Sequence, residues 1–235
     1  MGCLQSGPKS YFETDNSEER SIRKWEKDIG SFTVDFNMIH QKLSYSNDAY
    51  YSAVIKRISD QFFNQSFFKV IEKNSFFLKG SDENILDSNK IIALFFLLST
   101  PGLITSKYNS YSDKAYYLYL RSRENAEDDL DEALTKGEKL REFIKLLTEV
   151  SCIGFAGSYY KIQGSEERGL IIEAKKGVDR MIDYIIDCIF TLNGNKVDVL
   201  SFKDLKNKFS NDMYFLSSGY IREKATEYLN KQEKK

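Results

Sequence analysis

The first residues of the chain carry a pattern that directs covalent lipid attachment. The sequence begins Met1-Gly2-Cys3-Leu4-Gln5-Ser6, which fits the M-G-x-x-x-[ST] signal for N-myristoylation of Gly2. Cys3 lies beside that glycine and is a candidate for S-palmitoylation. One myristoyl chain gives only marginal membrane binding, whereas two acyl chains give a stable anchor. We therefore expect a lipidated N-terminus that places the protein on the cytoplasmic face of a membrane.

The remaining sequence lacks the residue patterns of the common catalytic and metal sites. His40 is the single histidine, which leaves no partner for a multi-histidine metal site. Phosphate-binding, dinucleotide-binding, nucleophile-elbow and C-x-x-C motifs do not occur. Cys152 and Cys188 lie in apolar runs, as buried small side chains do. We expect a protein that is not an enzyme and has no resident cofactor.

Composition favours a globular, helical body. The 235 residues are 41% hydrophobic and 29% charged, with a formal net charge of −1 and only two prolines. This balance argues against nucleic acid as a partner, because such binding needs a surplus of positive charge. The longest apolar run, residues 91–98, is too short to span a bilayer. It predicts a buried core helix.

Apolar spacing predicts a series of amphipathic helices. Ile22, Trp25, Ile29 and Phe32 share one face of a helix that begins near Ser17. Further helices are expected over residues 47–71, from 88 onward, and over 115–120, 136–150, 178–189, 202–209 and 221–229. The small residues at 154–157 indicate a turn, and residues 158–169 indicate an insertion. Strands are limited to one or two short pairings between loops, with residues 197–200 as the candidate.

Three of the predicted helices follow a polar or acidic stretch, a leucine and a residue that can cap a helix. These leucine and cap pairs are Leu86 with Asp87, Leu134 with Thr135, and Leu200 with Ser201. A cap side chain accepts a hydrogen bond from the first turn of its helix. An acid three residues later, as at Glu138 and Asp204, completes a capping box.

This order of features resembles an EF-hand: a helix, an acidic loop, a leucine, a capping residue and a second helix. Together with the lipidation signal, the chain resembles the calcineurin B and neuronal calcium sensor families over roughly residues 68–210. The resemblance implies an all-α fold of EF-hand-like helix-loop-helix pairs in two lobes. We expect a flexible tether over residues 1–16, an N-terminal lobe over 17–110 with one degenerate unit, a C-terminal lobe over 111–231 with two, and a polar tail over 232–235.

The resemblance also implies one candidate Ca²⁺ site, in the second unit. The ligand positions one, three, five and twelve of its loop fall on Glu127, Asp129, Asp131 and Glu138. Ca²⁺ takes six to eight oxygens, and the loop needs a glycine at position six for its sharp turn. Glu132 occupies that position here, so we expect weak Ca²⁺ binding at most.

The first and third loops depart further from the pattern. The first has Lys79 and Lys90 at positions one and twelve, and these would repel the ion. The third has Asn193 and Asn195 at positions one and three, with the short Asp204 at position twelve. Neither loop is expected to bind Ca²⁺. An unrelated helical bundle remains an alternative, because acidic residues near helix N-termini are favoured by the helix dipole in any case.

The resemblance implies a hydrophobic groove that holds an amphipathic helix of a partner protein. Its candidate lining residues are Phe62, Phe63, Phe67, Phe68, Phe76 and Phe77. We therefore expect a membrane-tethered adaptor whose binding is largely independent of Ca²⁺. Two alternatives stay open: a structural subunit of a large ciliary or cytoskeletal assembly, and a Ca²⁺ sensor with one weak loop.

Overall fold

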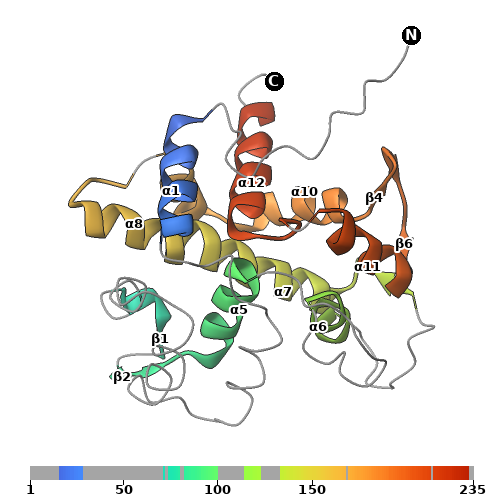
Figure 1. Cartoon of the computed structure of the whole chain (residues 1–235), viewed down its shortest axis with the longest axis horizontal. Helices are drawn as coiled ribbons and strands as arrows, with labels where there is room; N and C mark the ends of the chain where they lie inside the picture. Colours follow the sequence, from blue (N-terminus) through green and yellow to red (C-terminus); the bar gives the residue numbers. More distant parts are fainter. Residues whose placement is uncertain are drawn as a thin grey trace.

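The computed structural model describes residues 16–28, 71, 74–79, 82–99, 114–122, 133–167, 169–212 and 214–232. These residues are mostly helical, which confirms the predicted class (Figure 1). Within them, no helix has both the length and the apolar character needed to cross a membrane. The helices are α1 (Ser17–Asp28), α5 (Ser88–Leu98), α6 (Lys114–Ser122), α7 (Glu138–Glu149), α8 (Ala156–Gln163), α9 (Leu170–Lys176), α10 (Asp179–Ile189), α11 (Phe202–Asn211) and α12 (Ser218–Gln232).

Short antiparallel strand pairs accompany the helices. The strands are β1 (Leu78–Lys79), β2 (Asp82–Leu86), β3 (Leu134–Thr135), β4 (Thr191–Leu192), β5 (Asn195–Lys196) and β6 (Val199–Leu200). The pair β3–β6 joins the second and third predicted units, as expected around residues 197–200. The pairs β1–β2 and β4–β5 are local hairpins that the sequence pattern did not predict.

The second and third units form one four-helix arrangement around the β3–β6 pair. In that pair Leu134 faces Leu200, and Thr135 faces Val199. Helix α6 packs on α11, and α7 packs on α10. Each predicted unit therefore supplies one two-residue strand and two helices. The first helix of each unit packs on the second helix of the other unit.

The predicted turn at residues 154–157 is wrong, because this segment is helical. The π-helix η4 (Val150–Phe155) joins α7 to α8 without a break. Gly154 permits close packing there, since a Cβ atom on it would lie 2.6 Å from Cδ1 of Phe76. Asn74 also donates from Nδ2 to the Gly154 carbonyl oxygen at 2.8 Å. The small residues thus serve helix packing and not a change of direction.

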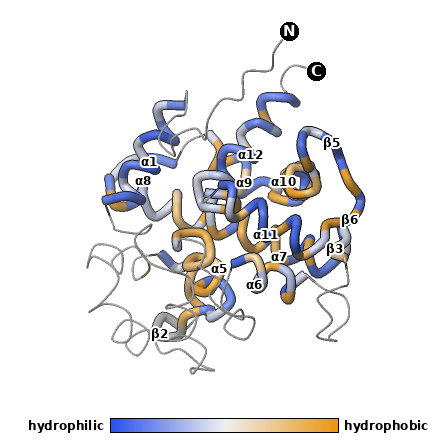
Figure 2. The backbone as a smooth tube through the Cα atoms, turned by 45° about the vertical axis from the view of Figure 1, so that its right-hand side comes forward, coloured by the Kyte–Doolittle hydropathy of each residue, from blue (hydrophilic) through white to orange (hydrophobic). Residues whose placement is uncertain are grey.

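Hydrophobic packing joins both predicted lobes in one buried cluster. Helix α5 is the predicted core helix, and Figure 2 shows it as strongly hydrophobic. Its Phe96 ring lies 5.5 Å from that of Phe143 in α7 and 6.3 Å from that of Phe209 in α11, measured between centroids. The described parts of residues 17–110 and 111–231 therefore share a core, and the predicted boundary between them lies outside the described residues.

Two of the three predicted helix caps are confirmed. The Asp87 side chain accepts from the backbone N–H groups of Asn89 and Lys90 at the start of α5. Ser201 and Asp204 form a capping box at the start of α11. The third prediction is wrong, because α7 begins after Gly137 without a side-chain cap. Thr135 lies in β3, so strand pairing positions it two residues before the cap.

Candidate functional site

Most of the sequence-predicted site residues lie outside the described residues. These are Gly2, Cys3, Glu127, Asp129, Asp131, Phe62, Phe63, Phe67 and Phe68. The lipidation signal and three of the four candidate Ca²⁺ ligands therefore stay predictions. The fourth, Glu138, is exposed at the first residue of α7.

The third predicted ion loop is folded as a hairpin. Asn193 and Gly194 have φ values of 51° and 82°, the left-handed backbone that a tight two-residue turn requires. Asn193 and Asn195 are both exposed. At position twelve, Oδ2 of Asp204 accepts from the Ser201 hydroxyl at 2.6 Å and from the Ser201 backbone at 3.2 Å. That carboxylate therefore caps α11 in this arrangement.

Lysine at position twelve of the first loop has a packing role. Nζ of Lys90 donates to the carbonyl oxygen of Phe76 at 2.8 Å. It also lies 4.6 Å from the centroid of the Phe76 ring, a cation–π contact. Lys90 thus packs against Phe76 at the position where the predicted ion loop would need a carboxylate. Among the described residues, no group of three or more His, Cys, Asp or Glu side chains could hold a metal ion.

The two described phenylalanines of the predicted groove differ in exposure. Phe77 is fully buried and belongs to the core, so in this structure it is not a groove-lining residue. The reason is its place on η2 (Ser75–Phe77), directly beneath the π-helix at Gly154. Phe76 is half-buried and lines a cavity of about 580 Å³ with Ile153 and Lys161.

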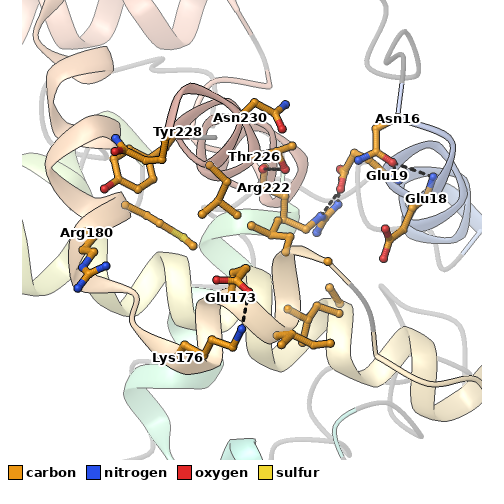
Figure 3. Close-up of a pocket in the computed structure, with 18 of the residues that line it drawn as sticks. Asn16, Glu18, Glu19, Glu173, Lys176, Arg180, Arg222, Thr226, Tyr228 and Asn230 are labelled. Carbon is orange, nitrogen blue, oxygen red and sulfur yellow. Dashed lines mark hydrogen bonds and ion pairs between the residues drawn. The ribbon is translucent and has the colours of Figure 1, made fainter. Parts of the chain in front are cut away.

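A larger groove of about 920 Å³ lies among α1, α9, α10 and α12 (Figure 3). Part of its lining is apolar, from Ile22, Ala156, Leu170, Ile171, Ile172, Met181 and Leu229. Ile172 is 42% exposed, one of the few large apolar side chains so open among the described residues. Charged residues stand at opposite ends in Figure 3, with Glu18 on α1 and Arg180 on α10.

Behind this groove, α1 and α12 share a buried set of charges, which we call the arginine cluster: Glu19, Arg23, Glu26 and Arg222. Nε and Nη2 of Arg222 donate to the two carboxylate oxygens of Glu19 at 2.7 and 2.8 Å. Nη1 of Arg222 donates to Glu26 at 2.9 Å. Arg23 donates to Glu19 at 2.8 Å and to the Gly219 carbonyl at 3.0 Å. Arg23 also donates to Glu223 at 2.8 Å, and the Glu223 side chain is 40% exposed. Two arginines are therefore paired with two buried glutamates and one partly exposed glutamate.

The geometry of the cluster is what makes buried charges tolerable. Removing a charge from water costs several kcal/mol, and only close, well-directed hydrogen bonds offset that cost. Arg222 meets this condition through a bidentate contact with Glu19, the arrangement that the planar guanidinium favours. The cluster therefore fixes the position of α1 on α12 accurately while contributing little net stability.

The buried one of the two described cysteines is Cys152. Cys152 lies in the π-helix and is fully buried. Burial raises the pKa of its thiol to about 12, because the thiolate is disfavoured away from water. The thiol therefore stays protonated at neutral pH, in agreement with the prediction that Cys152 is a packed small side chain.

Sequence reasoning missed the arginine cluster, although the pattern contained a signal. On α1, residues 19, 22, 23 and 26 have the spacing of a buried helix face, yet three of the four are charged. On α12, Arg222 takes a place in the buried face between Ile221 and Ala225. Opposite charges on two predicted buried faces indicate that those faces meet. Comparison of the chain with protein-family models, curated proteins and solved structures gave no match.

Proposed function

We propose that the protein is a non-enzymatic adaptor, tethered to a membrane by N-terminal acylation, whose EF-hand-like body binds a helix of a partner protein without requiring Ca²⁺. The observation that carries the EF-hand-like part is the β3–β6 pairing. It brings together the eighth positions of two predicted loops, Leu134 and Leu200. Two unrelated capped helices would have no reason to meet at equivalent positions.

The packing of helices from one unit on helices from the other also supports an EF-hand-like body. The helix that enters the second unit, α6, packs on the helix that leaves the third, α11. The helix that leaves the second, α7, packs on the helix that enters the third, α10. This exchange relates the two units by an approximate two-fold axis, as expected for a pair of similar helix-loop-helix units.

Independence from Ca²⁺ is supported by the side chains at the ligand positions. Lys90 replaces the acid at position twelve of the first loop and bonds to Phe76. Asp204, at position twelve of the third loop, is held by Ser201. Binding of Ca²⁺ there would require new oxygens and the loss of these contacts.

The groove beside α1 is the surface that we assign to the partner. Exposed apolar side chains within a groove, rimmed by charges, are typical of protein docking sites. The opposite charges of Glu18 and Arg180 suit an amphipathic helix with a basic residue at one end and an acidic residue at the other. Complementary charges of this kind fix the direction in which a helix binds.

The experiment is affinity capture from cells with the native N-terminus, comparing Ile172→Glu with Ile162→Glu. Ile162 is the matched control, because it is a helical isoleucine with 43% exposure against 42% for Ile172, and it lies outside the groove. We expect Ile172→Glu to lose a specific partner that wild type and Ile162→Glu retain. Equal retention by both variants would contradict the groove assignment.

The same capture tests the tether and the role of Ca²⁺. The intact mass should show acyl groups, and Gly2→Ala should remove them together with membrane association. Absence of acyl groups in wild type would favour the structural-subunit alternative. Partner affinity should be equal with Ca²⁺ and with a chelator. A change of about tenfold or more, about 1.4 kcal/mol, would favour a Ca²⁺ sensor acting through Glu127, Asp129, Asp131 and Glu138.

A further inference from the structure

We propose that α1 is a movable wall of the groove, held against α12 by the arginine cluster, so that the groove is complete only while α1 is docked. Asn16, Glu18, Glu19 and Ile22 form the α1 side of the groove. Across it stand α9 and α12, and Arg222 of α12 connects the two sides through Glu19 (Figure 3). Loss of α1 would remove one side of the groove and leave the other in place.

The composition of α1 sets the strength of its docking. The helix has only two apolar side chains among its twelve residues, Ile22 and Trp25. Ile22 is buried, and the Trp25 ring lies 4.8 Å from that of Phe155 and 5.4 Å from that of Tyr159. Figure 2 shows α1 as mainly hydrophilic, in contrast to α5. Little apolar area is therefore available to hold α1, compared with a core helix.

The other buried residues of this interface are charged, which makes docking both specific and readily reversed. The attraction between buried ions is largely offset by the cost of removing them from water. The cluster itself therefore adds little net free energy to docking while all its charges are paired, which leaves Ile22 and Trp25 as the main apolar contacts. If Arg222 is lost, however, Glu19 and Glu26 stay buried with fewer hydrogen bonds to offset their charge, and the docked state becomes unfavourable.

The position of α1 in the chain links its movement to the N-terminal segment that carries Gly2 and Cys3. The helix begins at Ser17, and its cap Asn16 accepts from the backbone N–H groups of Glu18 and Glu19. The segment that carries Gly2 and Cys3 is thus joined covalently to the groove wall. Control of partner binding by this wall rests on the proposed function, whereas the movement itself does not.

Trp25 allows the movement to be measured without any partner, because it is the single tryptophan of the chain. In Arg222→Met, we expect Trp25 emission to shift to longer wavelength and its quenching by acrylamide to approach that of the unfolded chain. Trypsin should cleave within α1 at least about tenfold faster, because cleavage follows the population of the open state. The far-UV circular dichroism of the remaining helices should still show one cooperative transition.

A rescue variant separates docking from folding. Replacing all four members of the arginine cluster by Met removes its buried charges together, and buried ion pairs can be exchanged for apolar residues with little loss. Glu223, which also accepts from Arg23, keeps its charge, but its side chain is 40% exposed. We expect this variant to return Trp25 to its wild-type emission. If Arg222→Met fails to fold, Glu19→Met carries the same test, since it removes the main partner of both arginines and changes α1 alone.

Two results would overturn the proposal. One is an unchanged, protected Trp25 in Arg222→Met, which would mean that apolar contacts hold α1. The other is exposure of Trp25 only together with loss of the remaining helices, which would mean that α1 does not move separately. Neither result affects the adaptor proposal, which is decided by the Ile172 and Ile162 variants.

Discussion

Two helix interfaces of this protein are bridged by paired charges, but only one of them buries those charges. Between α10 and the segment formed by α7 and the residues just before it, three exposed ion pairs form a ladder: Lys136 with Asp187, Arg141 with Asp183, and Lys145 with Asp179. Between α1 and α12, the arginine cluster is buried, and the Arg222 side chain is only 1% exposed. Ion pairs of the same kind are thus exposed to water at one interface and removed from water at the other.

The layer beneath each set of charges explains the difference. Under the ladder, α7 and α10 meet through buried apolar side chains: Leu140, Ile144, Leu147, Ile182, Ile185 and Ile189. Those side chains hold the helices together, and exposed ion pairs add little to them. At α1 the charges themselves occupy the buried face. Apolar side chains therefore fill the buried layer of the first interface, whereas charged side chains make up most of the buried face of α1 at the second.

The largest expected contrast is between two arginine substitutions. Arg222→Met should disfavour the docked state of α1 by about 3–5 kcal/mol, because Glu19 and Glu26 stay buried but lose their hydrogen bonds from Arg222. Arg141→Met should change the free energy of unfolding by about 0–1 kcal/mol, because its pair with Asp183 is exposed. Trp25 fluorescence reports the first effect and urea titration the second. Similar effects at both sites would abolish the distinction between the interfaces.

The apolar layer under the ladder should tolerate substitution poorly. Ile144 is fully buried in α7. Ile144→Ala should lower the free energy of unfolding by about 2–5 kcal/mol, since it removes buried methyl groups and leaves a cavity. Urea titration followed by far-UV circular dichroism measures this. A loss no larger than that of Arg141→Met would mean that the ladder, and not the apolar layer, holds α7 against α10.

The π-helix between these interfaces should show a smaller effect. Gly154→Ala places a Cβ atom 2.6 Å from the Phe76 ring, and such overpacking should lower the free energy of unfolding by about 1–3 kcal/mol. Gly177→Ala is the control, because nothing lies within 4 Å of its added Cβ. Thermal unfolding of both variants measures the difference. Equal melting temperatures would argue against close packing at Gly154.

The smallest expected effect is the pH dependence of the ladder. Hydrogen bonds from Lys196 and then Lys136 lower the pKa of Asp187 in the folded state. The Asp187 carboxylate therefore binds a proton more readily in the unfolded chain than in the folded protein. Its contribution to the free energy of unfolding is present above the unfolded pKa of about 3.9. This contribution is lost as the pH falls below that value toward the folded pKa. Urea titrations between about pH 5 and pH 2 should show less loss of stability in Asp187→Asn than in wild type. If the free energy of unfolding depended on pH identically in both proteins, Asp187 would not be paired with Lys196 and Lys136 in solution.

Much of the helical body was predictable because each helix has a signal within its own segment of the sequence. The apolar face of α10, the caps at Asp87 and Ser201, and the leucines that pair in β3–β6 all follow from spacing within one segment. The hairpin at Asn193 and Gly194 carries an equally local turn signal, but the ion-loop interpretation of the third unit obscured it.

The charged faces and the π-helix were not predictable in the same way. Glu19 and Arg222 are far apart in the sequence, and each alone has the appearance of an exposed surface residue. Gly154 looks like part of a turn until Phe76 is placed against it. In each case the decisive partner comes from another element, so no pattern within one segment could identify it.

The sequence by itself determined the helical class and most positions of the described helices, because these depend on residues close together in the chain. Acylation at Gly2 and Cys3 and the absence of Ca²⁺ binding in two loops stay predictions. Only the tertiary structure decided that α1 and α12 meet through buried charges, that Phe77 belongs to the core, and that a groove lies beside Ile172. Burial is the physical reason. A charge or a ring acquires its role only when other elements remove it from water, and that depends on which elements come together.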